Sequence, residues 1–586
     1  DWLNEETMDP SSRTLITYGD GEGIAFRWDS PLALTQAQVD DLSFGGDANL
    51  GRDRLAYIRG DQSQEGAGAA RQFRVRNSLL GTIVNSSPNV VGAPSSLWPD
   101  RAPFGADGKR YSDFYENKKN RTPVVYAGAN DGMLHGFKAT VDSGGEELIG
   151  YIPSFIFSAS ASEGLHYLTS PNFNHRYYVD LPTRKQDVYA KGRRANGNPT
   201  NSADWRTVLL GGGRAGGKGI FALDVTDPTA FSEANATQLA LWEFTSDDDG
   251  RLGYITQPPV IAMSEWGGQE RWSVFVANGY NSDTQSTGFF ILDFEGGLDG
   301  NWSGDYQYVE FSSSGKGLSP LTVLDTTGDY KADRVYAGDL DGNVWVAQVN
   351  PDGNWGPAYA APLFIAEESI TGGLAVGANR EESRAGNLPN LMVYFGTGQY
   401  LESDDLADTS KQAFYGVWDR GDSNLGITNL VSRTMTNEVR DVDGAQTEIR
   451  VASGSIINFG DHHGWYAELP DTAERVVNNP IVRGDYVYVN SIIPNMDPCA
   501  GGGSGWIMAF GRMSGLVADN SKAFERLPDD SQGYRTDGMP SQIVIRGDVL
   551  LYDESGEGNP PKVEELPPLS SSVPGAGRRG WIELVE

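Results

Sequence analysis

The sequence predicts an all-β protein, a β-propeller of seven blades with loop insertions, and three observations support this. Glycine supplies 73 and proline 30 of the 586 residues, which suits many strands joined by many turns. Short runs rich in Val, Ile, Tyr and Phe recur, separated by Asp-Gly, Asn-Gly or Gly-rich turns that are typical of hairpins. The same strand order recurs about seven times without a linker, which favours one ring of blades over a row of separate β-sandwiches.

The repeats follow one plan. A Pro precedes an apolar run, and two further strands then flank a Gly-rich turn. Because both faces of a propeller blade pack on neighbouring blades, its strands are expected to be continuously apolar, as in SVFVA at 273–277. In chain order, the strands of the seven repeats lie at 124–137, 207–224, 274–293, 335–346, 393–417, 487–508 and 543–552.

The two ends of the chain are expected to be less regular. Residues 1–80 are predicted to be a polar, largely irregular N-terminal segment that packs on a propeller formed by residues 81–586, with a candidate helix at 34–42 and a short strand at 55–58. Residues 556–579, rich in Pro, Ser and Gly, are predicted to be irregular, and residues 580–585 to close the ring against an early strand. No signal peptide opens the chain, so we expect a targeting segment upstream in a longer protein.

The most informative stretch is DTTGDYKAD at 325–333, between two predicted strands. Oxygen-bearing side chains fall at its first, third, fifth and ninth positions: Asp325, Thr327, Asp329 and Asp333. Calcium prefers six to eight oxygen ligands, and the first nine positions of an EF-hand loop supply them at this spacing, with a backbone carbonyl at position seven, here Lys331. Because three nearby carboxylates repel one another, a bound cation would stabilise the turn.

Two positions of this loop depart from the EF-hand pattern. Position six is Tyr330, where a glycine normally makes the sharp turn, and a left-handed Tyr costs on the order of 1 kcal/mol. Position twelve is Tyr336, so the bidentate Glu is missing. The alternative, an Asp-rich turn that faces water without a metal, therefore stays open.

Composition limits the partners of the protein. The formal net charge of −33 argues against nucleic acid, because phosphate binding needs a basic face. No apolar run approaches the ~20 residues of a membrane-spanning helix, so no transmembrane segment is expected. Cys499 is the single cysteine, which excludes an internal disulfide.

Several motifs resemble one known family. The stretches VVYAGANDGMLHGF at 124–137, GGKGIFALDVTDP at 216–228, DRVYAGDLDGNVW at 333–345 and DPCAGGGSGWIM at 497–508 resemble the C-terminal domain of the PilY/PilC family of type IV pilus-associated proteins. Residues 84–88 and 475–480 fit it too, and the likeness runs from about Leu55 to the end of the chain. The resemblance implies a modified, quinoprotein-like propeller of seven blades.

The resemblance also implies a calcium site whose ligands are Asp325, Thr327, Asp329, the Lys331 carbonyl and Asp333. Family members often have Asn at position three and Gly at position six, so Thr327 and Tyr330 are departures. The implied role is that of a non-enzymatic protein of the pilus tip and the extracellular or outer-membrane surface. It would support type IV pilus biogenesis, let calcium bias pili between extension and retraction, and take part in adhesion, twitching motility and virulence. Pilins and a host or abiotic surface are the expected partners.

Other motifs are interpreted as structural. Four Arg-Gly-Asp triplets, at 59–61, 420–422, 483–485 and 546–548, are read as turns, and only the first lies in a region loose enough to present it to a receptor. Residues 212–219 nearly match a phosphate-binding loop, but lack the final Ser or Thr, so a glycine hairpin is favoured. His462 and His463 would point to opposite faces of a strand, which argues against a shared metal.

Two other functions stay open. Quinoprotein dehydrogenases are also propellers with calcium, and the sequence pattern of their blades resembles that of this chain. They stack the quinone on a disulfide between adjacent cysteines, however, and Cys499 is the single cysteine here. A lectin-like carbohydrate binder would show exposed Trp side chains clustered on one rim.

Overall fold

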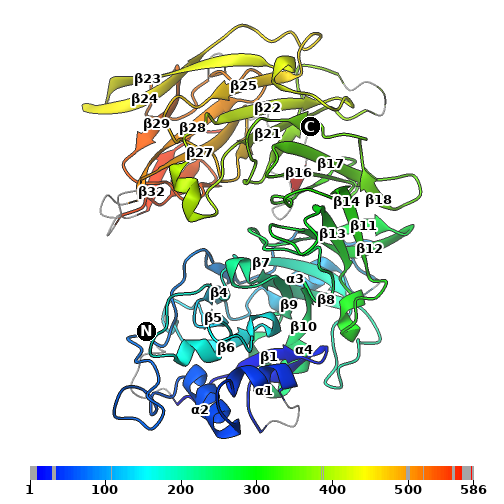
Figure 1. The fold of residues 1–586 in the computed structure, drawn as a ribbon. Helices are drawn as coiled ribbons and strands as arrows, with labels where there is room; N and C mark the ends of the chain where they lie inside the picture. Colours follow the sequence, from blue (N-terminus) through cyan, green and yellow to red (C-terminus); the bar gives the residue numbers. More distant parts are fainter. Residues whose placement is uncertain are drawn as a thin grey trace. The chain divides into compact units, whose positions relative to one another are not determined.

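The computed structural model shows a chain dominated by strands with few helices, which confirms the all-β prediction (Figure 1). It describes residues 9–29, 34–106, 108–383, 386, 388–495, 502–518, 521–556, 561–569 and 582–583. The chain forms two compact units, Asp1–Val309 and Glu310–Glu586, called unit 1 and unit 2 below. Within the described ranges, every helix is too short or too polar to cross a membrane.

Unit 1 opens with a six-stranded sheet in the order β2-β1-β6-β5-β4-β3. Its strands are β1 (Leu15–Gly19), β2 (Glu22–Ala25), β3 (Asn89–Val91), β4 (Val124–Ala129), β5 (Met133–Lys138) and β6 (Glu147–Ile152). Because β1 pairs in parallel with β6, residues 15–25 extend a sheet that residues 89–152 otherwise build. The N-terminal segment, predicted to be irregular, therefore supplies two strands of a regular sheet.

Two helices add further regular structure to this segment. The helix predicted at 34–42 is confirmed as α1 (Gln36–Leu42), which the Thr35 hydroxyl caps by accepting the Gln38 N–H. The strand predicted at 55–58 is wrong, because these residues lie in α2 (Ala48–Arg59). The Asp47 carboxylate caps the start of α2, and Gly60, with φ of 115°, ends it. These caps decide the local structure, and a four-residue apolar run is too short to outweigh them.

Two more sheets are four-stranded meanders, in the orders β10-β9-β8-β7 and β11-β12-β13-β14, and all of their residues except the last three of β14 belong to unit 1. All of β13 is buried, so both of its faces are covered, as the blades of a propeller require. The number of blades, seven, stays a prediction. The strands are β7 (Arg184–Ala190), β8 (Asp204–Gly212), β9 (Gly219–Asp224), β10 (Ala240–Thr245), β11 (Val260–Trp266), β12 (Gln269–Ala277), β13 (Thr287–Asp293) and β14 (Tyr306–Ser312), and the helices are α3 (Tyr111–Lys118) and α4 (Ala236–Leu239).

Unit 2 contains the sheet that carries the 325–333 loop. Its order is β18-β17-β16-β15-β33, and β19 also pairs with β17. The strands are β15 (Thr322–Asp325), β16 (Arg334–Gly338), β17 (Asn343–Val349), β18 (Trp355–Pro357), β19 (Phe364–Ile365) and β33 (Ile582–Glu583). A cluster of buried apolar side chains, which includes Leu324, Tyr336, Val344 and Phe395, packs against this sheet.

The rest of unit 2 consists of a ten-stranded sheet, β20-β21-β22-β25-β23-β24-β29-β28-β27-β26, and a three-stranded sheet, β30-β31-β32. The ladder between β21 and β22 has six paired positions, and residues 397–412 connect these two strands. The strands are β20 (Ala375–Ala378), β21 (Leu391–Gly396), β22 (Ala413–Asp419), β23 (Val431–Val442), β24 (Ala445–Ser453), β25 (Gly464–Glu468), β26 (Ile481–Arg483), β27 (Tyr486–Pro494), β28 (Gly503–Gly511), β29 (Ser531–Thr536), β30 (Val544–Arg546), β31 (Val549–Tyr552) and β32 (Lys562–Glu565).

The final strand does not pair as predicted. β33 pairs in parallel with β15, at Leu324 and Asp325, so the prediction that residues 580–585 close against an early strand is wrong. A free edge of β15 offers unpaired N–H and C=O groups, and β33 covers them. β32 is a regular strand inside the segment predicted to be irregular, of which 557–560 and 570–579 lie outside the described residues.

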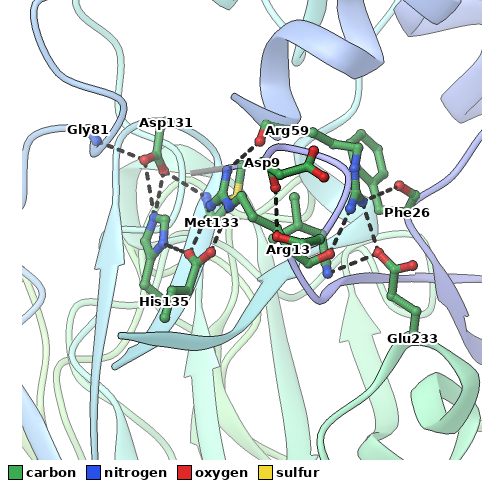
Figure 2. Close-up of polar contacts among 12 residues, drawn as sticks. Asp9, Arg13, Phe26, Arg59, Gly81, Asp131, Met133, His135 and Glu233 are labelled. Atoms are coloured by element: carbon green, nitrogen blue, oxygen red, sulfur yellow. Dashed lines mark hydrogen bonds and ion pairs between the residues drawn. The ribbon is translucent and has the colours of Figure 1, made fainter. Parts of the chain in front are cut away.

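A buried network of charged side chains joins the N-terminal segment to β5 and β6 (Figure 2). We call Arg13, Asp131, His135 and Glu147 the His135 network. The His135 ring, fully buried, has Nδ1 2.7 Å from Glu147 Oε1 and Nε2 3.1 Å from both Asp131 oxygens, and Arg13 Nε donates to Glu147 Oε2 at 2.6 Å. Because both ring nitrogens face carboxylates, both carry protons. Burial opposes the charge, but Asp131 and Glu147 outweigh it and raise the pKa of His135 to about 9.

Candidate metal centre

The 325–333 loop is a hairpin connection, as predicted. β15 and β16 pair antiparallel, with Leu324 opposite Arg334, and the loop joins them. The Asp333 N–H donates to the Leu324 carbonyl at 2.9 Å, and the Asp333 carbonyl accepts the Val349 N–H at 3.1 Å. Backbone hydrogen bonds therefore fix the end of the loop to β15 and β17.

Asp325 organises the first half of the loop. Its side chain is buried, and Oδ1 accepts the N–H groups of Thr327 (3.0 Å) and Gly328 (2.7 Å). Oδ2 accepts the Tyr330 N–H at 2.7 Å, and the Thr327 hydroxyl donates to Oδ1 at 3.2 Å. Two predicted ligands, Asp325 and Thr327, are thus already in contact, and within the described part of the chain the Asp325 carboxylate is held by neutral donors only.

The turn needs two left-handed residues. Gly328 has φ of 75° and Tyr330 has φ of 73°. The left-handed conformation predicted for position six is therefore confirmed. A glycine adopts it freely, whereas Tyr330 carries a strain of about 1–2 kcal/mol.

Asp333 closes the loop. Its two carboxylate oxygens accept the Thr326 N–H and hydroxyl at 2.9–3.1 Å. Burial, followed by the negative charges of Asp325 and Asp329, raises the pKa of Asp333 to about 6. Thr326 is a residue that the ligand spacing does not reveal, although Thr hydroxyls are known to form hydrogen bonds within turns.

Asp329 is the most exposed of the three acids and has its own cation. Its Oδ1 accepts the Lys331 N–H at 3.0 Å, and its Oδ2 lies 3.1 Å from Lys331 Nζ. Two predicted ligand residues, Asp329 and Lys331, are thus in contact. The contact is made by the Lys331 side chain and N–H, whereas the predicted ligand is the Lys331 carbonyl. An exposed pair of this kind contributes less than about 1 kcal/mol, so a divalent ion could displace it.

The donor set fits calcium chemically, although the acids are not gathered into a finished cage. In the part of the chain that the structure describes, no group of three or more His, Cys, Asp or Glu side chains is placed to hold a metal ion. The carboxylates and the Thr327 hydroxyl are nevertheless the oxygen ligands that calcium prefers. The Asp333 carboxylate is half-buried, and no described basic side chain forms an ion pair with it. Binding would require Asp329 to leave Lys331 and turn inward.

The Arg-Gly-Asp triplet at 59–61 is not available to a receptor, which corrects the expectation that this copy could be presented. Arg59 is 4% exposed, and its guanidinium contacts Glu233 (2.9 Å) and the Arg13 carbonyl (2.7 Å). Figure 2 shows Arg59 between Phe26, Arg13 and Glu233. Gly60 is the C-cap of α2, so the turn interpretation is confirmed for this copy.

The phosphate-loop resemblance at 212–219 is likewise structural. Residues 212 and 219 end β8 and begin β9, and these two strands pair antiparallel. A short 3₁₀ turn, Arg214–Gly216, lies between them where a phosphate site would need the start of a helix. The glycine hairpin is confirmed.

Comparison with known proteins decides the family. A family model described as the PilY1 beta-propeller domain matches residues 80–449, more than half of the chain. The chain belongs to the PilY1 β-propeller family. The type IV pilus biogenesis factor PilY1 of Pseudomonas aeruginosa strain PAK is 35% identical over 526 residues, which cover 82% of this chain and 42% of that relative. A PilY1 homolog of Xylella fastidiosa strain Temecula1 is 31% identical over 513 residues, which cover 82% of this chain and 32% of the homolog.

A solved structure agrees with the family assignment. The crystal structure of the P. aeruginosa PilY1 C-terminal domain aligns with a TM-score of 0.58 and 26% identity, covering 81% of this chain and 99% of that domain. The PilY/PilC resemblance of the sequence motifs is thereby confirmed, and so is a β-propeller domain. The quinoprotein-like character of the propeller stays a prediction. The chain spans less than half the length of the curated PilY1 relatives described above.

Proposed function

We propose that this chain is the β-propeller region of a type IV pilus biogenesis factor that works at the pilus or the outer cell surface. Membership of the PilY1 family carries this proposal, because the curated relatives are named type IV pilus biogenesis factors. Pilus components, the major or minor pilins, are the proposed partners. Adhesion to a host or abiotic surface, twitching motility and virulence form the second part of the proposed role.

The 325–333 loop is proposed to bind Ca²⁺ through Asp325, Thr327, Asp329, the Lys331 carbonyl and Asp333. Support comes from the spacing of these oxygens, from the turn that Asp325 already holds, and from the desolvated Asp333 carboxylate. Bound calcium would supply the positive charge that three neighbouring acids need.

The loop is also proposed to link calcium to pilus extension and retraction. Asp325 is the last residue of β15, and the backbone of Asp333 is hydrogen-bonded to β15 and β17. Ordering of the loop would therefore stiffen the end of this hairpin. A pilus component that contacts the hairpin would then bind the calcium-loaded form more tightly, which is how a ligand shifts an equilibrium.

We favour a binding role over an enzymatic or lectin-like one. Each Trp that the structure describes is buried or half-buried, so a rim of exposed Trp for carbohydrate has no support there. The quinone site of a dehydrogenase would need adjacent cysteines, and the sequence contains one cysteine, Cys499, which lies outside the described residues.

Calorimetric titration and cell assays test this proposal together. Calcium is titrated into the wild-type chain, into Asp329→Ala and Asp333→Ala, and into a control, Asp352→Asn, which changes an exposed acid in the β17–β18 turn. We expect binding heat in the wild type and the control and little in the two loop variants.

The full-length protein with Asp329→Ala, returned to a bacterium that lacks its own PilY1, should alter the amount of surface pili or twitching. Absence of binding heat in the wild type would contradict the proposed calcium site. Normal pili in a bacterium without any PilY1 protein would contradict the proposed role in pilus biogenesis.

A further inference from the structure

A second acidic site lies in unit 2, away from the 325–333 loop in sequence. A pocket of about 380 Å³ is lined mostly by the segment that joins β21 to β22, together with residues 368–369. Its lining includes four carboxylates, those of Glu368, Asp404, Asp405 and Asp408, and no basic side chain. We call it the β21–β22 pocket.

A buried arginine fixes this pocket from behind. Arg475 is 1% exposed, and its guanidinium donates to the carbonyls of Gln399 (2.8 Å), Asp405 (2.6 Å) and Asp408 (2.7 Å). The guanidinium hydrogen bonds of Arg475 thus go to backbone carbonyls, and its positive charge also helps to lower the pKa of the nearby Asp408 carboxyl. Because the segment is tied at three points, the pocket is preformed, which lowers the entropy lost when a ligand binds.

The four acids divide into two roles. Asp405 accepts the Leu401 N–H (2.6 Å) and Gln399 Nε2 (3.1 Å), and Asp408 accepts the Ser410 N–H (2.8 Å), so both hold the segment in shape. Asp404 and Glu368 form no ion pair with any described residue, although a side-chain hydrogen bond from Ser410 acts to lower the pKa of Glu368, so their negative charges remain for a ligand to neutralise. Burial, and next the charge of Asp408, raises the pKa of Glu368, so a cation in the pocket would relieve this repulsion.

Gln412 supplies an independent sign of a missing partner. Its side chain is 3% exposed and lines the pocket, and its Nε2 donates to the Ser410 hydroxyl at 2.8 Å. Its Oε1 is buried and has no hydrogen-bond partner among the residues that the structure describes. An unpaired buried acceptor is unfavourable, so its presence in an acid-lined pocket indicates a ligand that brings N–H donors.

The shape and rim of the pocket point to an organic cation. The acids are not arranged as a metal cage among the described residues, and the pocket is far larger than a bare ion. Tyr400 and Leu401, 40% and 37% exposed, lie on the same segment between the lining residues 399 and 404. Apolar surface beside an acidic pocket suits the aliphatic stem of a long basic side chain and the residues that flank it.

We propose that the β21–β22 pocket binds a lysine or arginine side chain of a partner polypeptide. The charged head of that side chain donates hydrogen bonds to Glu368, Asp404 and Gln412 Oε1, and its stem lies against Tyr400 and Leu401. None of these residues belongs to the 325–333 loop, so this interaction uses other residues than the proposed calcium site.

Peptide titration tests the pocket. The wild-type chain, kept in EGTA at low ionic strength, is titrated by fluorescence anisotropy with a labelled Gly-Leu-Lys-Leu-Gly peptide and with the same peptide carrying Gln in place of Lys, both with blocked ends. We expect the lysine peptide to bind at least about tenfold more tightly, with a preference that shrinks as salt screens the charges. The double variant Glu368→Gln/Asp404→Asn should lose that preference. A matched control, Glu381→Gln/Asp443→Asn, removes two exposed acids of unit 2 and should keep it.

A Gln412 variant and two competing ligands, 1,5-diaminopentane and calcium, test the proposed role of the pocket further. Gln412→Met should weaken lysine-peptide binding without lowering the melting temperature, whereas a purely structural Gln412 would lower the melting temperature and leave binding unchanged. Equal affinity for the two peptides, or an unchanged preference in the pocket variant, would overturn the proposal. If 1,5-diaminopentane binds as tightly as the peptide, the claim that the basic group comes from a polypeptide is contradicted. If calcium displaces the lysine peptide from the Asp329→Ala variant, the β21–β22 pocket is a metal site instead.

Discussion

Two groups of acids in this molecule are neutralised in different ways. In the His135 network of unit 1, Asp131 and Glu147 are each in contact with a buried cation, His135 or Arg13. In the 325–333 loop of unit 2, Asp325 and Asp333 are held by N–H and hydroxyl groups, and the one cation, Lys331, pairs with the exposed Asp329. Acids that carry their own counter-ions build structure, whereas acids held by neutral donors retain a charge that a ligand can neutralise.

The largest expected effect is the loss of one charge from the His135 network. Glu147→Gln leaves Arg13 and His135 without a shared counter-ion in a buried site, and breaking such a pair costs about 3–5 kcal/mol. Urea denaturation measures this loss. The control is Asp53→Asn, which removes an exposed partner of Arg71 and should cost less than about 1 kcal/mol. Equal costs for the two variants would show that the network is no more than a surface feature.

The second effect is a pH dependence that belongs to unit 1. The pKa of His135 is raised to about 9 in the folded chain, above the ~6.5 of an unfolded histidine. The stabilisation is therefore fully present below about pH 6.5 and is lost as pH rises through about 9, and its size is on the order of 3 kcal/mol. Denaturation curves collected between pH 6 and pH 10 measure it, and His135→Asn should flatten this part of the profile. A wild-type profile that is already flat would contradict the charged state of His135.

The third effect belongs to the 325–333 loop. Calcium at about one hundred times its Kd should stabilise the wild-type chain by about 2.7 kcal/mol, seen as a rise in melting temperature that EGTA reverses. Asp329→Ala should lose this response and keep its circular dichroism spectrum, because Asp329 is exposed and outside the sheet ladder. A melting temperature that neither calcium nor EGTA changes would show that the acids of this loop, like those of the His135 network, need no added cation.

The smallest effect concerns the strained turn. Tyr330→Gly should relieve the positive φ and stabilise the chain by at most about 1 kcal/mol, with a modest gain in calcium affinity. The same substitution at Tyr336, which is buried in β16, serves as the contrast and should be strongly destabilising. A loss of stability in Tyr330→Gly would show that contacts of the ring outweigh the strain of the backbone.

Short-range chemistry was readable from the sequence. The hairpin at 325–333, the left-handed Tyr330 and the helix at 34–42 follow from turn residues, ligand spacing and caps. The missed helix α2 shows the limit of a short window, because Asp47 and Gly60 mark its ends while residues 55–58 alone look like a strand.

Long-range pairings were not readable in the same way. Nothing near His135 in the sequence points to Arg13, and the ligand spacing of the 325–333 loop does not show that Lys331 turns its side chain toward Asp329. Such contacts depend on tertiary packing and side-chain rotamers, which residue order leaves undetermined. The β21–β22 pocket is of this type, since Arg475 reaches it from a distant part of the chain.

The pairing of β33 with β15 has a consequence for the order of assembly. Residues 582–583 complete the edge of a sheet whose first strand, ending at Asp325, emerges from the ribosome much earlier. Until that late segment arrives, the hydrogen-bonding edge beside the hairpin is open to any other extended chain, which is a known route to misassembly. The newly made polypeptide therefore finishes this edge among the last parts of unit 2, and a premature stop codon shortly before it would expose the strand that carries Asp325.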